Sequence, residues 1–165
     1  MVGGTSGHLG GEVLRVQAGL PLTHVPYSGS GPAWADLPGG RVDMVLDNIQ
    51  AALPHQQAGR VRILAVSGQD RLALLPDTPT LWERLPGYLV HSWNGIAGLA
   101  GLPPEIAARL SGLIATAMRG ATLRARYAEL GMEIPAPSPA HFAGFIGEQL
   151  AFWQRVIAGT NIRLE

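Results

Sequence analysis

The sequence contains no cysteine among its 165 residues. This excludes disulfide bonds, thiolate zinc sites and cysteine nucleophiles, although it fits any cellular compartment. Charged residues are also scarce, at 15% of the chain, with 12 basic and 12 acidic side chains. Because the formal net charge is zero and the basic residues are scattered, the sequence has no electrostatic footprint for nucleic acid or an anionic membrane.

Long hydrophobic runs are absent too, since no segment reaches the roughly 20 apolar residues that a membrane helix needs. The first five residues, Met1 to Thr5, have neither the basic start nor the apolar core of a signal peptide. On the residues alone, the expected location is therefore cytoplasmic. What the chain does have is 47% hydrophobic residues, 22 glycines and 13 prolines. The glycines and prolines punctuate it regularly, as in a globular α/β protein with many short connections.

Short helices alternate with apolar segments in the first part of the chain. Helices are expected over residues 6–18, 33–37 and 49–58, and strands over residues 22–27, 42–46 and 61–67. This alternation predicts parallel βαβ units. Segments that are apolar on both faces fit a sheet covered by helices on both sides.

The pattern changes after residue 67, where prolines leave little regular structure up to residue 87. Strands are then expected over residues 88–97 and 132–135. A long helix is expected from Pro104 to about Leu130, with Gly120 as a possible interruption. A last helix should begin after Ser138, which is a good N-cap, with Pro139 just inside it.

The first candidate site is a glycine-rich turn at the start of the first helix, carrying Thr5, Ser6, Gly7 and His8. Such a turn presents backbone N–H groups and the positive end of the helix dipole, which together suit an anion. Ordinary N-capping by Thr5 or Ser6 explains the same residues, and taken alone it is the better explanation.

Two further candidate sites follow predicted strands, at the sheet edge where α/β proteins bind ligands. Their residues are Tyr27, Ser28, Gly29, Ser30 and Gly31 in one turn, and Asp47 and Asn48 in the other. The first turn and the start of the first helix could direct two helix N-termini at one carboxylate. Gly29 and Gly31 in the Tyr27–Gly31 turn are expected to allow a positive φ or a close approach of the backbone to a ligand. The alternatives are a plain loop for the first turn and helix capping for the second.

Catalytic and cofactor motifs are not found. There is no nucleophile elbow, no Walker loop, and no dinucleotide fingerprint, because Trp34 stands where a third glycine is needed. The five histidines do not show metal-ligand spacing. The sequence therefore predicts no catalytic residue, no metal and no cofactor, and an α/β enzyme is the weakest of the functions considered.

Several segments, in order, resemble the receptors of tripartite tricarboxylate transporters, the Bug family. They include Gly4 to Leu9, His24 to Gly29, Leu37 to Asp43, Asp47-Asn48, Ala58 to Arg62, Leu75 to Thr80, and Ser92-Trp93. The run His24-Val25-Pro26-Tyr27 and the run from Leu75 to Thr80 are the most specific. The resemblance covers essentially the whole chain.

The resemblance implies an α/β fold of the type II periplasmic-binding-protein kind, in which two domains close on a ligand. Residues 1–67 would form most of the second, ligand-cleft domain, a nearly complete Rossmann-like unit. Residues 68–91 would be a crossover or linker, and residues 92–165 the C-terminal part of the first domain. Because family members carry a long preceding region, a truncated receptor is expected.

The function implied is capture of a small organic carboxylate or acidic amino acid in the periplasm for the membrane components of the transporter. The first alternative is a ligand-sensing domain of a regulator with the same fold, although no helix-turn-helix motif precedes the matching segments. The long helix from Pro104 and the last helix carry wide apolar faces. We therefore expect self-association through exposed apolar surface.

Overall fold

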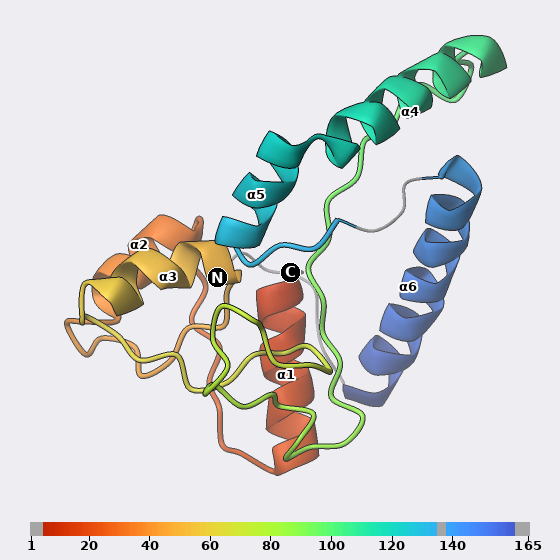
Figure 1. Ribbon diagram of the computed structural model, residues 1–165. Coiled ribbons are helices and arrows are strands. Elements are labelled where there is room, and N and C mark those ends of the chain that lie inside the picture. The colour runs from red at the N-terminus through yellow and green to blue at the C-terminus, as the bar shows by residue number, and fades with distance from the viewer. Residues whose placement is uncertain (1–4, 135–137, 161–165) are drawn as a thin grey trace. The chain divides into compact units, whose positions relative to one another are not determined.

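The computed structural model describes residues 5–134 and 138–160, with side chains described as far as residue 158 (Figure 1). The chain divides between Ser92 and Trp93 into two compact units. The second unit ends at Arg155, and the residues from Val156 group with the first.

Three helices belong to the first unit: α1 (Ser6–Ala18), α2 (Ser30–Asp36) and α3 (Ile49–Gln57). The predicted bounds of α1 are confirmed, and Gly19 ends it at φ 63°, with its N–H donating to the Arg15 carbonyl. Helix α2 begins at Ser30, three residues before the start at residue 33 that the sequence indicated.

The predicted strands are extended segments without ladder pairing. Within the described ranges, the only bridge is the isolated parallel pair of Val66 with Thr80. The structure therefore does not form the strands that the sequence predicted over residues 22–27, 42–46 and 88–97. The strand predicted over residues 132–135 is not formed at residues 132–134 either, and residue 135 lies outside the described ranges. An apolar pattern specifies an extended backbone, but a strand also needs a neighbour about 4.8 Å away to accept its hydrogen bonds.

The core of the first unit lies against α1. Leu9, Val13 and Leu14 form its buried face, at the spacing that places residues on one side of a helix. Tyr88 and Val90, from a segment far along the chain, are buried with them. A second buried group joins α2 to α3 and consists of Ala33, Trp34, Ala52 and Leu53. The ring of Trp34 stacks on His55 with centroids 4.8 Å apart.

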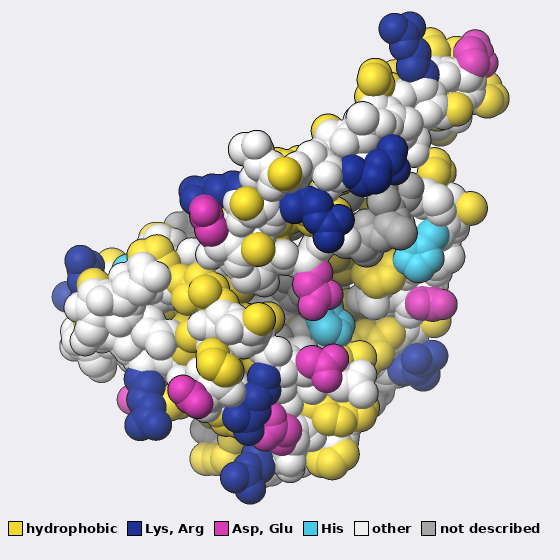
Figure 2. Space-filling model, in the orientation of Figure 1, with side chains coloured by type: hydrophobic (Ala, Val, Ile, Leu, Met, Phe, Trp, Pro, Cys, Tyr) yellow, Lys and Arg dark blue, Asp and Glu magenta, His cyan; other side chains and the backbone are white. Residues whose placement is uncertain are grey.

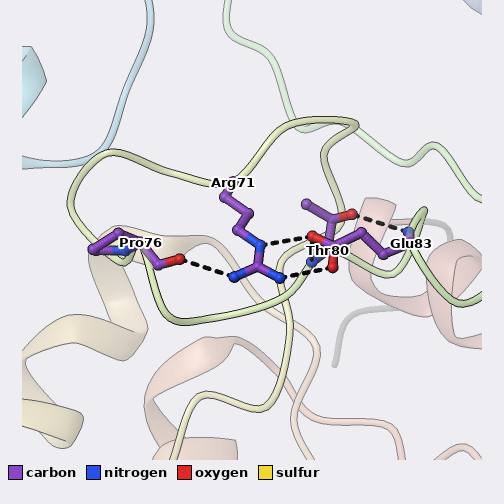
Figure 3. A network of polar contacts seen from close by, with 4 residues as sticks. All are labelled: Arg71, Pro76, Thr80 and Glu83. Carbon is purple, nitrogen blue, oxygen red and sulfur yellow. Dashed lines mark hydrogen bonds and ion pairs between the residues drawn. The ribbon is translucent and has the colours of Figure 1, made fainter.

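A polar network organises the proline-rich segment after residue 67 (Figure 3). Thr80 and Glu83 form a capping box: the Glu83 N–H donates to Thr80 Oγ1 at 3.1 Å, and the Thr80 N–H donates to Glu83 Oε1 at 3.2 Å. The Arg71 guanidinium binds both Glu83 carboxylate oxygens, at 2.7 and 2.8 Å, and also donates to the Pro76 carbonyl at 3.1 Å. These side-chain bonds tie together a segment that has no regular helix, alongside backbone bonds such as that from the Leu81 N–H to the Val66 carbonyl at 2.8 Å.

We expect the replacement Glu83→Gln to lower the melting temperature at neutral pH. Hydrogen bonds from Arg71 and then from the Thr80 N–H lower the pKa of Glu83 to about 2. A carboxylate with a depressed pKa stabilises the fold above its ordinary pKa and loses that effect as the pH falls toward 2. The difference between wild type and variant should therefore disappear in acid, as followed by thermal melts from pH 7 to pH 2.

Glu129→Gln is the matched control, because Glu129 accepts from Arg126 at 2.8 Å in an exposed pair on one helix. Such surface pairs contribute little to stability. A melting difference for Glu83→Gln no larger than for Glu129→Gln would show that the network adds nothing beyond an ordinary surface pair.

The second unit contains α4 (Pro104–Arg119), α5 (Ala121–Glu129) and most of α6 (Pro139–Thr160). The single helix predicted from Pro104 to about Leu130 is divided at Gly120, whose ψ of 133° is extended and not helical. Ser138 does cap α6, since its Oγ accepts from the His141 N–H at 3.1 Å. Among the helices described, none is long and apolar enough to cross a membrane.

Aromatic rings form the packed part of the second unit. Trp93 meets Phe142 and Phe145 edge to face, with centroids 5.7 and 5.4 Å apart. Many other apolar side chains are open to solvent, including Ile96 at 78%, Leu99 at 86% and Leu113 at 60% exposure. Figure 2 shows hydrophobic side chains at the surface over α4.

Candidate functional site

The turn at the start of α1 combines capping with an anion-binding geometry. Thr5 is the N-cap, and its Oγ1 accepts from the His8 N–H at a long 3.5 Å. The first intrahelical bond runs from the Leu9 N–H to the Thr5 carbonyl at 2.9 Å. The N–H groups of Ser6 and Gly7 precede that bond and therefore point out of the positive end of the helix. The capping explanation is correct for Thr5, and it leaves these two donors for an anion.

Tyr27 is tied into the fold by its hydroxyl. This group donates to Asp36 Oδ2 at 3.0 Å, and Asp36 in turn pairs with Arg41 at 2.7 Å. The hydrogen bond from Arg41, followed by that from Tyr27, lowers the pKa of Asp36, and burial with the Asp36 bond raises the pKa of Tyr27. Tyr27 thus connects the segment before the turn to the end of α2 and stays a neutral donor at ordinary pH.

The rest of this turn is open. Ser28, Ser30 and Gly31 are exposed, and no side chain caps α2 at Gly29. The expectation of a positive φ is wrong at both glycines: Gly29 is extended at φ 168°, and Gly31 is not among the described glycines with positive φ. A Cβ built on either glycine meets no atom within 4 Å other than those of the adjoining residues. The fold itself therefore does not require glycine here, and a close approach by a ligand remains a prediction.

Asp47 and Asn48 differ in what surrounds them. Asp47 uses both carboxylate oxygens within the protein: Oδ2 accepts from Trp34 Nε1 at 2.9 Å, and Oδ1 accepts from the Asn48 N–H at 2.8 Å. It therefore holds α2 to the start of α3. Asn48 is the N-cap residue of α3, but its exposed side chain makes no capping bond. Of the two, Asn48 is the better placed to meet a ligand.

A stacked pair of histidines joins two of the candidate segments. His8, in the first turn of α1, stacks on His24 with ring centroids 4.0 Å apart and planes inclined by 22°. His24 lies three residues before Tyr27, in the extended segment that leads into the open turn. Burial, followed by the charge of His8, lowers the pKa of His24. The structure thus brings the start of α1 beside the segment leading to the Tyr27–Gly31 turn, all within the first unit.

Sequence reasoning missed the buried residues that pack against α1 at Gly10. The Tyr88 hydroxyl donates to the Gly10 carbonyl at 3.2 Å, in the buried interior of the unit. A Cβ on Gly10 would lie 2.8 Å from Leu46 Cδ2 and 3.2 Å from Val90 Cγ1. Gly10 in the middle of a helix was the one available signal, because glycine there usually marks a close approach.

The comparisons with known proteins agree on one family. The sequence profile described as the tripartite tricarboxylate transporter family receptor matches residues 1–162. A relative from Pseudomonas sp. (strain P51), the UPF0065 protein in the tcbD-tcbE intergenic region, is 36% identical over 93% of this chain and 46% of its own length.

Two solved structures resemble the chain closely. Rpa4515 of R. palustris with adipate superposes with a TM-score of 0.90 at 33% identity, covering 96% of this chain and 54% of that one. MatC from Rhodopseudomonas palustris with bound malate gives a TM-score of 0.82 at 31% identity, covering 92% and 53%. The chain thus spans about half the length of these relatives.

These matches confirm the family resemblance and the α/β periplasmic-binding-protein class. They also agree with the prediction of a binding protein rather than an enzyme, because the matching family is one of transport receptors. The candidate site residues and the three-part division of the chain stay predictions.

Proposed function

Because this chain belongs to the tripartite tricarboxylate transporter receptor family, we propose that it captures a small organic carboxylate as a receptor, or as part of one. The observation that carries the proposal is the close similarity to structures holding adipate and malate, which are both dicarboxylates. The first-unit geometry supports it, because the Ser6 and Gly7 N–H groups lie at the positive end of α1. The ligand-facing residues proposed are the α1 turn, the open turn from Ser28 to Gly31, and Asn48.

The ligand is proposed to be held by backbone N–H groups and hydroxyls rather than by a cationic side chain. Neither turn contains a lysine or arginine. Charge-assisted bonds from N–H groups to a carboxylate are short and strong, and the helix dipole adds to them. A neutral amide of the same shape cannot supply the negative charge, so it should bind much more weakly.

A thermal-shift screen of adipate, malate and other organic acids tests the proposal, with adipamide as the neutral counterpart of adipate. A ligand at 100 times its dissociation constant stabilises the folded state by about 2.7 kcal/mol. We expect at least one carboxylate to raise the melting temperature and adipamide to leave it unchanged. The proposal fails if no carboxylate has an effect, or if adipamide matches adipate.

Replacing Gly31 by alanine should weaken carboxylate binding without weakening the fold. Apart from its two chain neighbours, which include Pro32, the new methyl group meets no protein atom within 4 Å, so the surrounding fold has room for it. Any loss of affinity would therefore come from blocking a ligand's approach to the backbone. Calorimetric titration with the acid found in the screen measures the affinity, and a thermal melt measures the fold.

Gly11→Ala is the control for this variant, because Gly11 also has open space around it but belongs to α1 and not to the Ser28–Gly31 turn. If Gly31→Ala binds as tightly as wild type, the turn does not contact the ligand, and the remaining candidates are the α1 turn and Asn48.

We further propose that the receptor works in the periplasm and delivers its ligand to the membrane components of the transporter. The support is the family itself, whose description names a tripartite transporter. Co-purification of the tagged chain with the membrane components of a tripartite tricarboxylate transporter from the same cells, in the presence and absence of the carboxylate, would test the partnership. A receptor should be retained in a ligand-dependent manner, and equal recovery with and without the carboxylate would speak against it.

Self-association through the second unit is a separate prediction. Ile106, Leu110 and Leu113 lie along α4 at helical spacing, and their exposed fractions are 44%, 48% and 60%. Exposed apolar rows of this kind drive association. Light scattering at micromolar concentration should report a mass above that of one chain, and Leu113→Ser should lower it. Leu64→Ser, a substitution of a leucine exposed at 66% in the first unit, should not; a monomeric wild type would refute the prediction.

A further inference from the structure

The histidine pair is a contact between two parts of the chain that are distant in sequence. His8 is the third residue of α1, and helical side chains lean toward the N-terminus, so its imidazole lies over the first turn. His24 comes from the extended segment after α1 and is half-buried. The rings stack at 4.0 Å and close to parallel. This is the one ring stack among the described residues that joins the start of α1 to the segment before Tyr27.

The charges around the pair oppose a second proton on it. Burial, His8 and the amino-terminal charge all lower the pKa of His24, and of the groups acting on it only Glu12 raises it. Glu12 is itself paired with Arg15 at 2.9 Å on the same helix face. Because Arg15 already pairs with Glu12, the Glu12 carboxylate can stabilise two stacked imidazolium rings only weakly. Two positive charges at such a short separation repel each other strongly when they are partly shielded from water.

We propose that His8 and His24 form a proton-sensitive clasp that holds the start of α1 to the segment leading into the Tyr27–Gly31 turn. While at least one ring is neutral, the stack is favourable and the two segments stay together. When both rings carry a proton, the stack separates and the segments part. The clasp would then make the spacing of the two turns depend on pH in the range where histidine titrates.

The sign of the effect on stability follows from the pKa of His24. A histidine with a lowered pKa in the folded state takes up its proton more readily in the unfolded state. The clasp therefore contributes fully above the ordinary histidine pKa of about 6.5 and is lost as the pH falls below it. For ligand binding, which rests on the proposed function, affinity should fall over the same range because the turns lose their spacing.

The test compares two replacements of His24 in the full chain. His24→Phe keeps an aromatic ring for stacking but removes the titrating group, whereas His24→Ala removes the stack. Between pH 7.5 and pH 5.5 we expect the wild-type melting temperature to fall by at least about 2 °C more than that of His24→Phe. His24→Ala should melt lower than wild type at pH 7.5 and show the same smaller fall between pH 7.5 and pH 5.5 as His24→Phe.

His55→Phe is the matched control, since His55 also stacks on an aromatic ring, Trp34, in the same unit. It should keep the wild-type pH dependence. NMR titration of the wild-type imidazoles gives a second readout that needs no variant of His24. The titration midpoint of the His24 ring should lie below 6.5 in the wild type and move upward in His8→Phe. Parallel melting profiles for wild type and His24→Phe, or a His24 midpoint unaffected by His8→Phe, would overturn the clasp.

Adipate titrations at both pH values extend the test to binding. Between the two pH values, adipate affinity should fall more in the wild type and in His55→Phe than in His24→Phe. Protonation of adipate itself affects all three proteins equally, so it cancels in this comparison. If no variant binds adipate at either pH, the proposed function fails for this ligand while the melting profiles still decide the clasp. If adipate binds with the same pH dependence in all three proteins, the clasp does not control the turns.

Discussion

Replacing Tyr88 by alanine should lower the free energy of unfolding by about 3–5 kcal/mol, the range for removing a buried aromatic side chain. The Tyr88 side chain has 0% exposure and lies in the core against α1. Its hydroxyl donates to the Gly10 carbonyl at 3.2 Å. Burial raises the pKa of Tyr88 to about 12, so the hydroxyl remains a donor at any pH where the protein is handled. The variant would lose the ring, the hydrogen bond and the packing around both.

Tyr88→Phe separates these contributions. It keeps the ring and removes only the hydroxyl, so it should cost about 1 kcal/mol, the usual net value of one hydrogen bond. Urea unfolding followed by tryptophan fluorescence measures both variants, and an unchanged m-value would show that the unfolded state is the same. A cost below about 2 kcal/mol for Tyr88→Ala would mean that the site collapses around the missing ring, and that the first unit has a looser core than the structure indicates.

The helices could be predicted from the sequence where local signals were strong. Helix α1 has a capping residue before it and Gly19 after it, and its bounds were predicted correctly. Ser138 likewise marked the start of α6. The division of the long helix at Gly120 could only be suspected, because glycine lowers helix stability without specifying where the backbone turns.

The strands and the segment after residue 67 could not be predicted in the same way. An apolar run fixes an extended backbone but not its neighbours, so the sheet pairing that was expected from Val42 to Leu46 is absent from the described residues. The Arg71–Glu83 network depends on two side chains 12 residues apart, and no local sequence pattern predicts such a pair. Both are tertiary features, decided by what the fold places side by side.

The candidate site residues stay predictions, and the structure shows only what surrounds each of them. The two glycine-rich turns were identified from their composition, whereas Tyr27 and Asp47 proved to be engaged with Asp36 and Trp34. Hydrogen-bonding side chains are equally suited to a ligand and to the fold, and only their positions decide between the two. The stack of His8 on His24 was likewise invisible in the sequence, because its members are 16 residues apart.

Replacing Gly10 by valine should destabilise the first unit by about 1–3 kcal/mol, the typical cost of overpacking a core. A Cβ at this position would lie 2.8 Å from Leu46 Cδ2, 3.2 Å from the Tyr88 hydroxyl and 3.2 Å from Val90 Cγ1. The leucine methyl can rotate away, but the buried tyrosine is fixed by its own hydrogen bond to the Gly10 carbonyl. The two branches of valine would add further atoms to a space that has no room for the first.

Gly11→Val provides the matched control, because Gly11 is the next residue of the same helix and has nothing within 4 Å of a built Cβ. Valine and glycine differ little in helix propensity, so this variant should unfold within about 0.5 kcal/mol of wild type. The difference between the two variants in urea unfolding is then the steric cost at Gly10 alone. Because Gly10 is two residues from His8, we expect the variant also to shift the start of α1 and to weaken the proposed carboxylate binding, whereas Gly11→Val should leave that binding unchanged. Equal stability of the two variants would show that α1 is not held against Tyr88 as closely as the structure places it.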